Sequence, residues 1–320
     1  MKRPANHLFK RGMQWLTRTT LIPLMALTLF LVLWSAVAAQ INTSLGKFPG
    51  PVQVWEQVEQ LSVEYREERG REAAFYERQA VRNAALLKED PHAEITVRPY
   101  TGKPTFVDQI LTSLLTVATG FFIASLIAVP IGIVCGMSQP LYQALNPLIQ
   151  LFKPVSPLAW LPLVTMVVSA VYVSDDPLLA KSFLNSAITV TLCCLWPTII
   201  NTTVGVASVE KDLLNVSRVL RLSWFTKTMK IVLPSATPMI FTGLRLSLGI
   251  GWMVLIAAEM LAQNPGLGKF VWDEFQNGSS DSLARIMVAV LTIGFIGFLL
   301  DRTMLLLQYK VSWDKSAVLR

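Results

Sequence analysis

The stretch NVSRVLRLSWFTKTMKIVLP, Asn215–Pro234, lies between two long apolar blocks and decides how the rest of the chain is interpreted. It carries four cations and no acid. Its pattern predicts two short helices that meet at a break around Leu222 and Ser223, with Ser223 as the N-cap of the second helix. Pro234 is expected to end that helix, and Pro238 fits the first turn of the next one.

Each of these two predicted helices, 215–220 and 224–232, presents a cationic edge beside apolar surface. The cations are spaced three residues apart, as Arg218 and Arg221 in one helix and as Lys227 and Lys230 in the other. Such a helix–turn–helix either docks on a protein partner or lies as a basic amphipathic loop on anionic lipid. The apolar residues available for docking are Val219, Leu220, Leu222, Trp224, Phe225 and Met229.

Apolar blocks of roughly 20 residues or more recur along the chain, which is the length that a helix needs to cross about 30 Å of hydrocarbon. Because lipid offers no hydrogen-bond partner to an unpaired backbone amide, each block is expected to be helical. We therefore predict an all-α fold, a polytopic membrane helical bundle with about six transmembrane helices. The blocks lie near residues 19–39, 110–137, 142–171, 183–206, 236–262 and 283–307.

The composition excludes several classes of protein. Of 320 residues, 52% are hydrophobic and 15% are charged, which is too apolar for an ordinary soluble domain. A net charge of +7 is explained more simply by cytoplasmic Lys and Arg than by nucleic-acid binding. The three cysteines lie in apolar blocks and are expected to be buried thiols. The two histidines have no metal-ligand spacing, so no metal site is expected.

Two segments precede the second apolar block. Residues 1–40 begin with cations, which favours an uncleaved signal-anchor helix with a cytoplasmic N-terminus over a cleavable signal peptide. Residues 41–106 form a loop with dense alternating charge, which predicts a solvated helix with ion pairs, ended by Pro91. Six crossings place this loop outside, and they place residues 207–235 and 309–320 inside. The acids expected on exterior loops are Asp175, Asp176, Asp273, Glu274 and Asp281.

Prolines are concentrated in the third apolar block. The run FKPVSPLAWLP, Phe152–Pro162, contains too many of them for one straight helix. A broken or re-entrant path is therefore expected there, and such a path requires either protein or a water-filled cavity around it.

Ionisable side chains inside apolar blocks are costly and need partners. Arg245 and Asp301 lie at similar depth in the last two blocks, so either they form an ion pair or Arg245 faces a central cavity and attracts an anion. Glu259 lies near the outer end of its block, where an interfacial position is expected. A stripe of small residues predicts close packing against a helix of this chain or of a second copy: Gly243, Ser247 and Gly251.

The segment NPGLGKF, Asn264–Phe270, contains a Gly-Lys pair but not a phosphate-binding loop. Gln263 stands where the first glycine is required, and Phe270 replaces the Ser or Thr that would hold Mg²⁺. No Ser/His/Asp or Cys/His set can be assembled either. We expect a turn here, no nucleotide site on this chain and no enzyme activity of the chain by itself.

The opening stretch resembles the cytoplasmic loop of ABC importer permeases, which carries the pattern E-A-A-x3-G-x9-I-x-L-P. Ile231, Leu233 and Pro234 match its end, whereas Arg221 replaces the Gly, and Asn215, Val216 and Ser217 replace E-A-A. Other segments resemble the nitrate/nitrite-type permeases, relatives of the taurine, alkanesulfonate and bicarbonate permeases. These segments are LFKPVSPLAWLPL, LWPTIINTTVGV, NVSRVLRLS, IFTGLRLSLGIGWMVLIAAEML, FVWDEF and GFLLDR.

The resemblance covers about two thirds of the chain and implies the transmembrane domain of a type I ABC importer at residues 107–308. It implies a multi-pass protein of the bacterial inner membrane, a homodimer with two cytoplasmic ATPase subunits, a periplasmic solute-binding protein and surrounding lipid. ATP is then bound and hydrolysed by the partner, and this chain needs no cofactor. The implied cargo is a small anion, nitrate or nitrite first, with taurine or another sulfonate, cyanate or bicarbonate as alternatives.

The resemblance also assigns roles to residues of this chain. A coupling helix at about 218–225 is implied to seat in a groove of the ATPase, and the substrate path is expected near Lys153, Arg245 and Glu259. A stand-alone secondary transporter and a membrane anchor or sensor remain as alternatives. The residues implied in ATPase coupling are Asn215, Ser217, Arg218, Arg221, Leu222, Ser223, Ile231, Leu233 and Pro234.

Overall fold

The structure is a computed structural model that describes residues 21–43, 46–90, 95, 97–173, 179–279 and 281–311, with the side chain of Glu89 left out. The predicted cations of the N-terminus, Pro91, and the acids Asp175 and Asp176 lie outside these residues. The chain forms two compact units: Met1–Arg66 with Glu274–Val288, and Glu67–Asp273 with Ala289–Arg320.

In the first unit, helix α2 (Ile22–Ala38) occupies the first predicted apolar block. A small antiparallel pair of strands, β1 (Asn42–Thr43) and β2 (Gly46–Lys47), follows it, and Trp34 Nε1 donates to the carbonyl of Pro49 at 3.2 Å. Helix α3 (Pro51–Glu89) begins in this unit. Arg285 donates to Glu274 at 2.7 Å and to both carboxylate oxygens of Glu64 at 2.7 and 3.1 Å.

The predicted charged helix is confirmed as α3, which has 39 residues. In the second unit its surface carries the expected ion pairs, including Arg71 to Glu67 at 3.5 Å and to Glu68 at 3.1 Å. Tyr100, on the segment that returns from α3, donates its hydroxyl to Glu68 at 2.7 Å. This hydrogen bond to a carboxylate raises the pKa of Tyr100 above its usual value.

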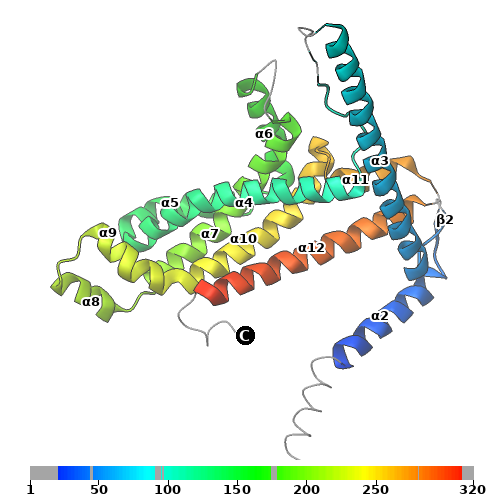
Figure 1. Ribbon diagram of the computed structural model, residues 1–320. Coiled ribbons are helices and arrows are strands. Elements are labelled where there is room, and N and C mark those ends of the chain that lie inside the picture. The colour runs from blue at the N-terminus through cyan, green and yellow to red at the C-terminus, as the bar shows by residue number, and fades with distance from the viewer. Residues whose placement is uncertain are drawn as a thin grey trace, which may run out of the picture. The chain divides into compact units, whose positions relative to one another are not determined.

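The second unit is a helical bundle in which α7 (Lys181–Ala207) lies between α4 (Phe106–Met137) and α10 (Leu233–Ala262), as Figure 1 shows. The second unit's part of α12 (Ser282–Val311) is linked to α10 by hydrogen bonds such as that from Trp252 Nε1 to the carbonyl of Ile293, at 3.0 Å. Helix α11 (Leu267–Asn277) follows α10 after a short turn.

The small-residue stripe of α10 packs on α7 of the same chain, which answers the question of its partner. Ser247 Oγ donates to the carbonyl of Cys194 at 2.7 Å. A Cβ added at Gly251 would lie 2.6 Å from Cys194 Sγ, and one added at Gly243 would lie 2.7 Å from Asn201 Cβ. The prediction of close packing is therefore confirmed, with no second copy needed for it.

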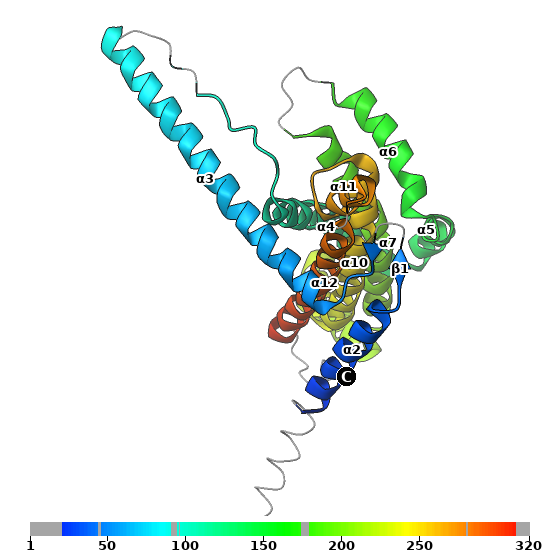
Figure 2. The same cartoon turned by 90° about the vertical axis from the view of Figure 1, so that its right-hand side faces the viewer.

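The predicted break in the third apolar block is also present. Helices α5 (Gln139–Phe152) and α6 (Pro157–Val171) are bent by 100° at a short break, and Figure 2 shows α6 turning away from α5. We call this break, residues 153–156, the elbow. Aromatic rings pack beside it: the ring centroid of Phe152 lies 6.0 Å from that of Trp196 of α7, on which it stacks, and 5.8 Å from that of Trp160. The prolines that start and interrupt α6 explain why the helix does not continue straight.

The described residues of the six predicted apolar blocks are helical, apart from Ala39 and the break in the third block. Four helices of the described chain are long and apolar enough to cross a membrane, namely α4, α7, α10 with the residues that precede it, and α12. The bent pair α5–α6 makes a fifth span if it is counted as one. Helix α2 has 17 residues, at the lower limit of the roughly 17–25 that a transmembrane helix needs.

The two expectations for prolines near the start of α10 are wrong. Helix α9 (Trp224–Lys227) continues through a π-helical turn, η2 (Thr228–Val232), directly into α10, so Pro234 does not end a helix. Pro238 lies inside α10 rather than in its first turn. The wider π-turn relieves the clash that a proline ring makes with the preceding helical turn, and it allows the helix to pass through.

Candidate functional site

The helix–turn–helix predicted at the break around Ser223 is present in the structure. Helix α8 (Lys211–Val219) ends in a left-handed residue, Arg221, with φ of 49°. The amide of Leu222 donates to the carbonyl of Ser217 at 3.0 Å, which closes the C-terminus of α8. Ser223 then caps α9, because its hydroxyl accepts from the amide of Thr226 at 3.2 Å.

Apolar side chains lie on the outside of this turn. We call Val219, Leu220, Trp224 and Phe225 the tip; they are 82%, 63%, 57% and 64% exposed. Arg218, Arg221 and Lys230 are exposed around them, and Arg218 donates to the side chain of Asn215 at 3.1 Å. Exposed apolar groups ringed by cations at the end of a membrane bundle are typical of a protein-docking surface.

Several residues expected in coupling lie between the helix–turn–helix and the bundle rather than on the exposed surface. Ser217 is 2% exposed and donates its hydroxyl to the carbonyl of Leu214 at 2.6 Å. Ile231 and Leu233 pack against a buried cluster that includes Val232 and Ala236, and Leu222 is only half-exposed. Ile231 and Leu233 thereby connect the helix–turn–helix to α7 and α10, because residues of both helices belong to that cluster.

Arg221 occupies a conformation that favours glycine, which gives a testable prediction. Arg221→Gly is expected to stabilise the protein by about 0.5–1 kcal/mol, because glycine adopts positive φ without a steric cost from Cβ. Thermal unfolding in detergent measures this change, with Arg218→Gly, in the last turn of α8, as the control that should destabilise. A destabilised Arg221→Gly variant would contradict the prediction.

The structure joins Arg245 and Asp301 in a two-point ion pair between α10 and α12. Arg245 Nε contacts Asp301 Oδ1, and its Nη2 donates to Oδ2 at 2.9 Å. The two side chains are 39% and 37% exposed, and they line a hollow of about 240 Å³ together with Leu248 and Trp252. Of the two expected roles of Arg245, the ion pair is the one that the structure contains.

Glu259 is fully buried within the protein, close to the C-terminal end of α10, so its carboxylate does not face the surface. Its carboxylate accepts from Ser113 Oγ at 2.8–2.9 Å and from the amide of Gly268 at 3.0 Å. Ser113 in turn accepts from the amide of Leu267 at 2.9 Å. The glycine-containing turn at 264–268 therefore wraps an internal carboxylate, and Glu259 joins α4 and α10 to the start of α11.

We call the hydrogen-bonded group around Glu259 the Glu259 joint. The sequence analysis did not identify Ser113, Asn264 and Gly268 as members of it. Asn264 is 1% exposed and donates to Thr116 Oγ1 at 3.3 Å. A Cβ at Gly268 would lie 2.1 Å from the carbonyl oxygen of Ile256, which explains the glycine. One signal was available in the sequence: Glu259, an acid with no cation nearby, is followed by Gly268 near the start of a helix, where backbone amides can hold a carboxylate.

Lys153 lies at the elbow between α5 and α6. It is the C-cap residue of α5, and its side chain is exposed. In the described part of the chain no carboxylate lies within ion-pair distance of it, whereas Arg245 is paired. Among the described residues, no group of three or more His, Cys, Asp and Glu has the arrangement of a metal site.

A family model for the binding-protein-dependent transport system inner membrane component matches residues 128–313. The chain belongs to this family. The matched range of this permease contains the elbow, the tip, Arg245, Glu259 and Asp301. It is therefore the multi-pass inner-membrane subunit of an ABC importer, a class that works with ATPase and substrate-binding partners.

Curated relatives agree with this family. The permease is 38% identical over 200 residues to the nitrate import permease protein NrtB of Synechocystis sp., a match that covers 62% of this chain and 68% of the relative. It is 34% identical over 289 residues to the bicarbonate transport system permease protein CmpB of Synechococcus elongatus, which covers 90% and 88%.

The solved structures show the same fold. The permease superposes on a chain of the inward-facing MetNI methionine ABC transporter with a TM-score of 0.56 at 13% identity. That match covers 65% of this chain and 96% of the other. The likeness supports the type I importer transmembrane fold and nothing about cargo.

Proposed function

We propose that the permease carries a small oxyanion, nitrate first, from the periplasm to the cytoplasm as part of an ATP-driven importer. The tip is the observation that carries the coupling part of this proposal, because it offers exposed apolar surface ringed by cations. The cargo is inferred from relatives that are named for the import of nitrate and of bicarbonate. Both anions are small planar oxyanions.

The continuous helix from Trp224 to Ala262 explains how docking would move the membrane part. A partner that holds the tip also holds the start of this helix, since α9, η2 and α10 are joined without a break. Closure of an ATPase on ATP would then turn α10 and, through the packing of Ser247 and Gly251, the adjoining α7. ATP would be bound by that partner, so this chain needs no cofactor.

The distribution of charge supports an orientation with the tip in the cytoplasm. Lys211, Arg218, Arg221, Lys227 and Lys230 lie in and around the helix–turn–helix. Asp273, Glu274 and Asp281 lie in α11 or between α11 and α12, which six crossings place outside. Both termini would then be cytoplasmic.

We further infer a homodimer. The Arg245–Asp301 pair is half-exposed, and lipid offers no hydrogen-bond partner to it, so a second copy of the chain would cover it.

Reconstitution tests this function directly. The complex of this permease with its ATPase and binding protein, in proteoliposomes, is expected to take up labelled nitrate only when ATP is present. Bicarbonate and taurine serve as competing cargoes, and vesicles that lack the ATPase serve as the control. Uptake driven by an ion gradient without the ATPase would instead show a secondary transporter.

A further inference from the structure

Helix α5 carries its polar side chains on one face. They are spaced three or four residues apart, so they form a single row along the helix. We call this row the α5 stripe: Gln139, Tyr142, Asn146, Gln150 and Lys153. Most of the remaining positions of α5 are apolar; Gln143 lies beside the stripe on the helix surface but does not line the cavity next to it. The only charge on the stripe is at the elbow, about 20 Å along the helix from Gln139.

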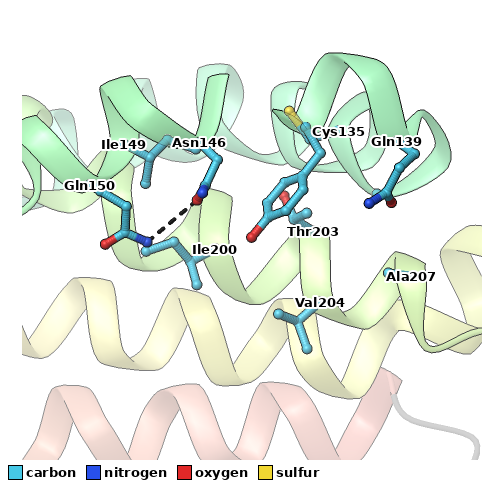
Figure 3. Close-up of a pocket in the computed structure, with 11 residues that line it drawn as sticks. Cys135, Gln139, Asn146, Ile149, Gln150, Ile200, Thr203, Val204 and Ala207 are labelled. Atoms are coloured by element: carbon cyan, nitrogen blue, oxygen red, sulfur yellow. Dashed lines mark hydrogen bonds between the residues drawn. The ribbon is translucent and has the colours of Figure 1, made fainter. Parts of the chain in front are cut away.

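A cavity of about 220 Å³ lies along this stripe, between α5 and the ends of α4 and α7. Figure 3 shows Gln139, Asn146 and Gln150 extending from the upper helices toward the segment of α7 that carries Thr203 and Val204. Tyr142 and Cys135 also line the cavity. The volume exceeds that of a single water, about 30 Å³, several times over, so the cavity has room for a hydrated small anion.

The hydrogen-bonding groups of this cavity are largely unused within the described chain. Gln150 donates to Asn146 Oδ1 at a long 3.4 Å, and Thr203 donates its hydroxyl to the carbonyl of Gly132 at 3.3 Å. The structure pairs no protein group with the amide nitrogens of Gln139 and Asn146 or with the hydroxyl of Tyr142. Polar side chains that only fasten two membrane helices together bond across the interface, as Thr203 does here, whereas the amide nitrogens of Gln139 and Asn146 and the hydroxyl of Tyr142 do not.

The cavity lies at the end of the bundle that carries the tip. Its α7 wall ends at Ala207, only a few residues before α8 begins at Lys211. Its α4 wall is Cys135 and Gly136, at the end where α4 passes into α5. The stripe therefore runs from the elbow, where Lys153 is exposed, to the surface that the proposed orientation places in the cytoplasm.

We propose that the α5 stripe and its cavity form the cytoplasmic half of the anion route. This inference rests on the proposed function. Lys153 attracts the anion to the elbow, and the amide groups of Asn146 and Gln150 then donate hydrogen bonds to its oxygens. Because these amides are neutral, they hold the anion weakly enough to release it toward Gln139 and the cytoplasm.

Transport measurements test the stripe with a control on the same helix. The double variant Asn146→Leu/Gln150→Leu is expected to lower nitrate uptake by about tenfold, the effect of losing two modest hydrogen bonds. Lys153→Gln is expected to lower uptake as well. Gln143→Leu removes the same kind of amide from a position of α5 that does not line the cavity, and it should leave uptake unchanged. ATP hydrolysis stimulated by the binding protein should persist in every variant.

A labelling measurement keeps the proposal testable if a variant assembles poorly. Asn146→Cys in a Cys135→Ala background should react with a membrane-impermeant thiol reagent from the cytoplasmic side, and nitrate should slow this reaction. Gln143→Cys in the same background should show no protection by nitrate. A wild-type complex that transports none of the anions would refute the proposed function itself. The stripe alone is refuted if nitrate is transported but the double variant matches Gln143→Leu, or if nitrate fails to protect Asn146→Cys.

Discussion

Replacement of Leu220 and Phe225 by Asp is expected to reduce ATP-driven uptake by more than about tenfold. Both side chains are exposed, at 63% and 64%, and neither belongs to a buried cluster, so the permease should still fold. In the proposed complex both side chains would lie in a groove of the ATPase. Two carboxylates in a groove that receives apolar side chains cost several kcal/mol each, because they lose their hydration there.

Co-purification with the ATPase and stimulated ATP hydrolysis measure this effect, and thermal unfolding in detergent checks that the variant is folded. The matched control is Leu220→Met/Phe225→Tyr, which keeps apolar surface at both positions and should retain association. If the Asp variant binds the ATPase and is stimulated as the wild type is, the tip is not the coupling surface. If the Asp variant still binds the ATPase but no longer binds anionic vesicles, the helix–turn–helix lies on lipid rather than on the ATPase.

Glu259→Ala is expected to destabilise the permease by about 2–5 kcal/mol. The substitution leaves the hydroxyl of Ser113 and the amide of Gly268 buried without their acceptor, and each such group costs about 1–3 kcal/mol. The start of α11 would detach from α4 and α10 as a result. Chemical or thermal unfolding of the purified protein, together with yield in the membrane, measures this loss.

Two further variants test whether the hydrogen bonds around Glu259, rather than its charge, stabilise the protein. Glu259→Gln keeps an acceptor oxygen in the same place and should lose far less stability than Glu259→Ala. Gly268→Ala leaves the carboxylate intact but brings a Cβ to 2.1 Å from the carbonyl oxygen of Ile256, so it should also destabilise. Wild-type stability of both Glu259→Ala and Gly268→Ala would show that the joint does not hold α11.

Local features of the sequence predicted local features of the structure well. Ser223 was expected to cap a helix after a break, and its hydroxyl accepts from the amide three residues later. The prolines of Phe152–Pro162 predicted a broken path, and the helices bend there by 100°. Each of these outcomes depends on backbone dihedral preferences and on hydrogen bonds between near neighbours, which a short stretch of sequence contains.

The same reasoning failed where a distant contact or an unusual backbone turn intervenes. Pro234 was expected to end a helix, but the π-turn before it lets the helix continue. The burial of Glu259 was not predicted, because its partner Ser113 is 146 residues away in the sequence. The stripe of α5 is visible in the sequence as a spacing, yet nothing in that spacing shows that α7 leaves a cavity beside it.

The sequence by itself determined the helical membrane bundle, its break points and the cationic helix–turn–helix, because hydropathy, proline positions and caps act within one turn or one span. Only the tertiary structure decided that Arg245 pairs with Asp301, that Glu259 holds the start of α11, and which apolar side chains form the tip. Those outcomes depend on how helices far apart in the chain pack together, and packing is a property of the whole bundle.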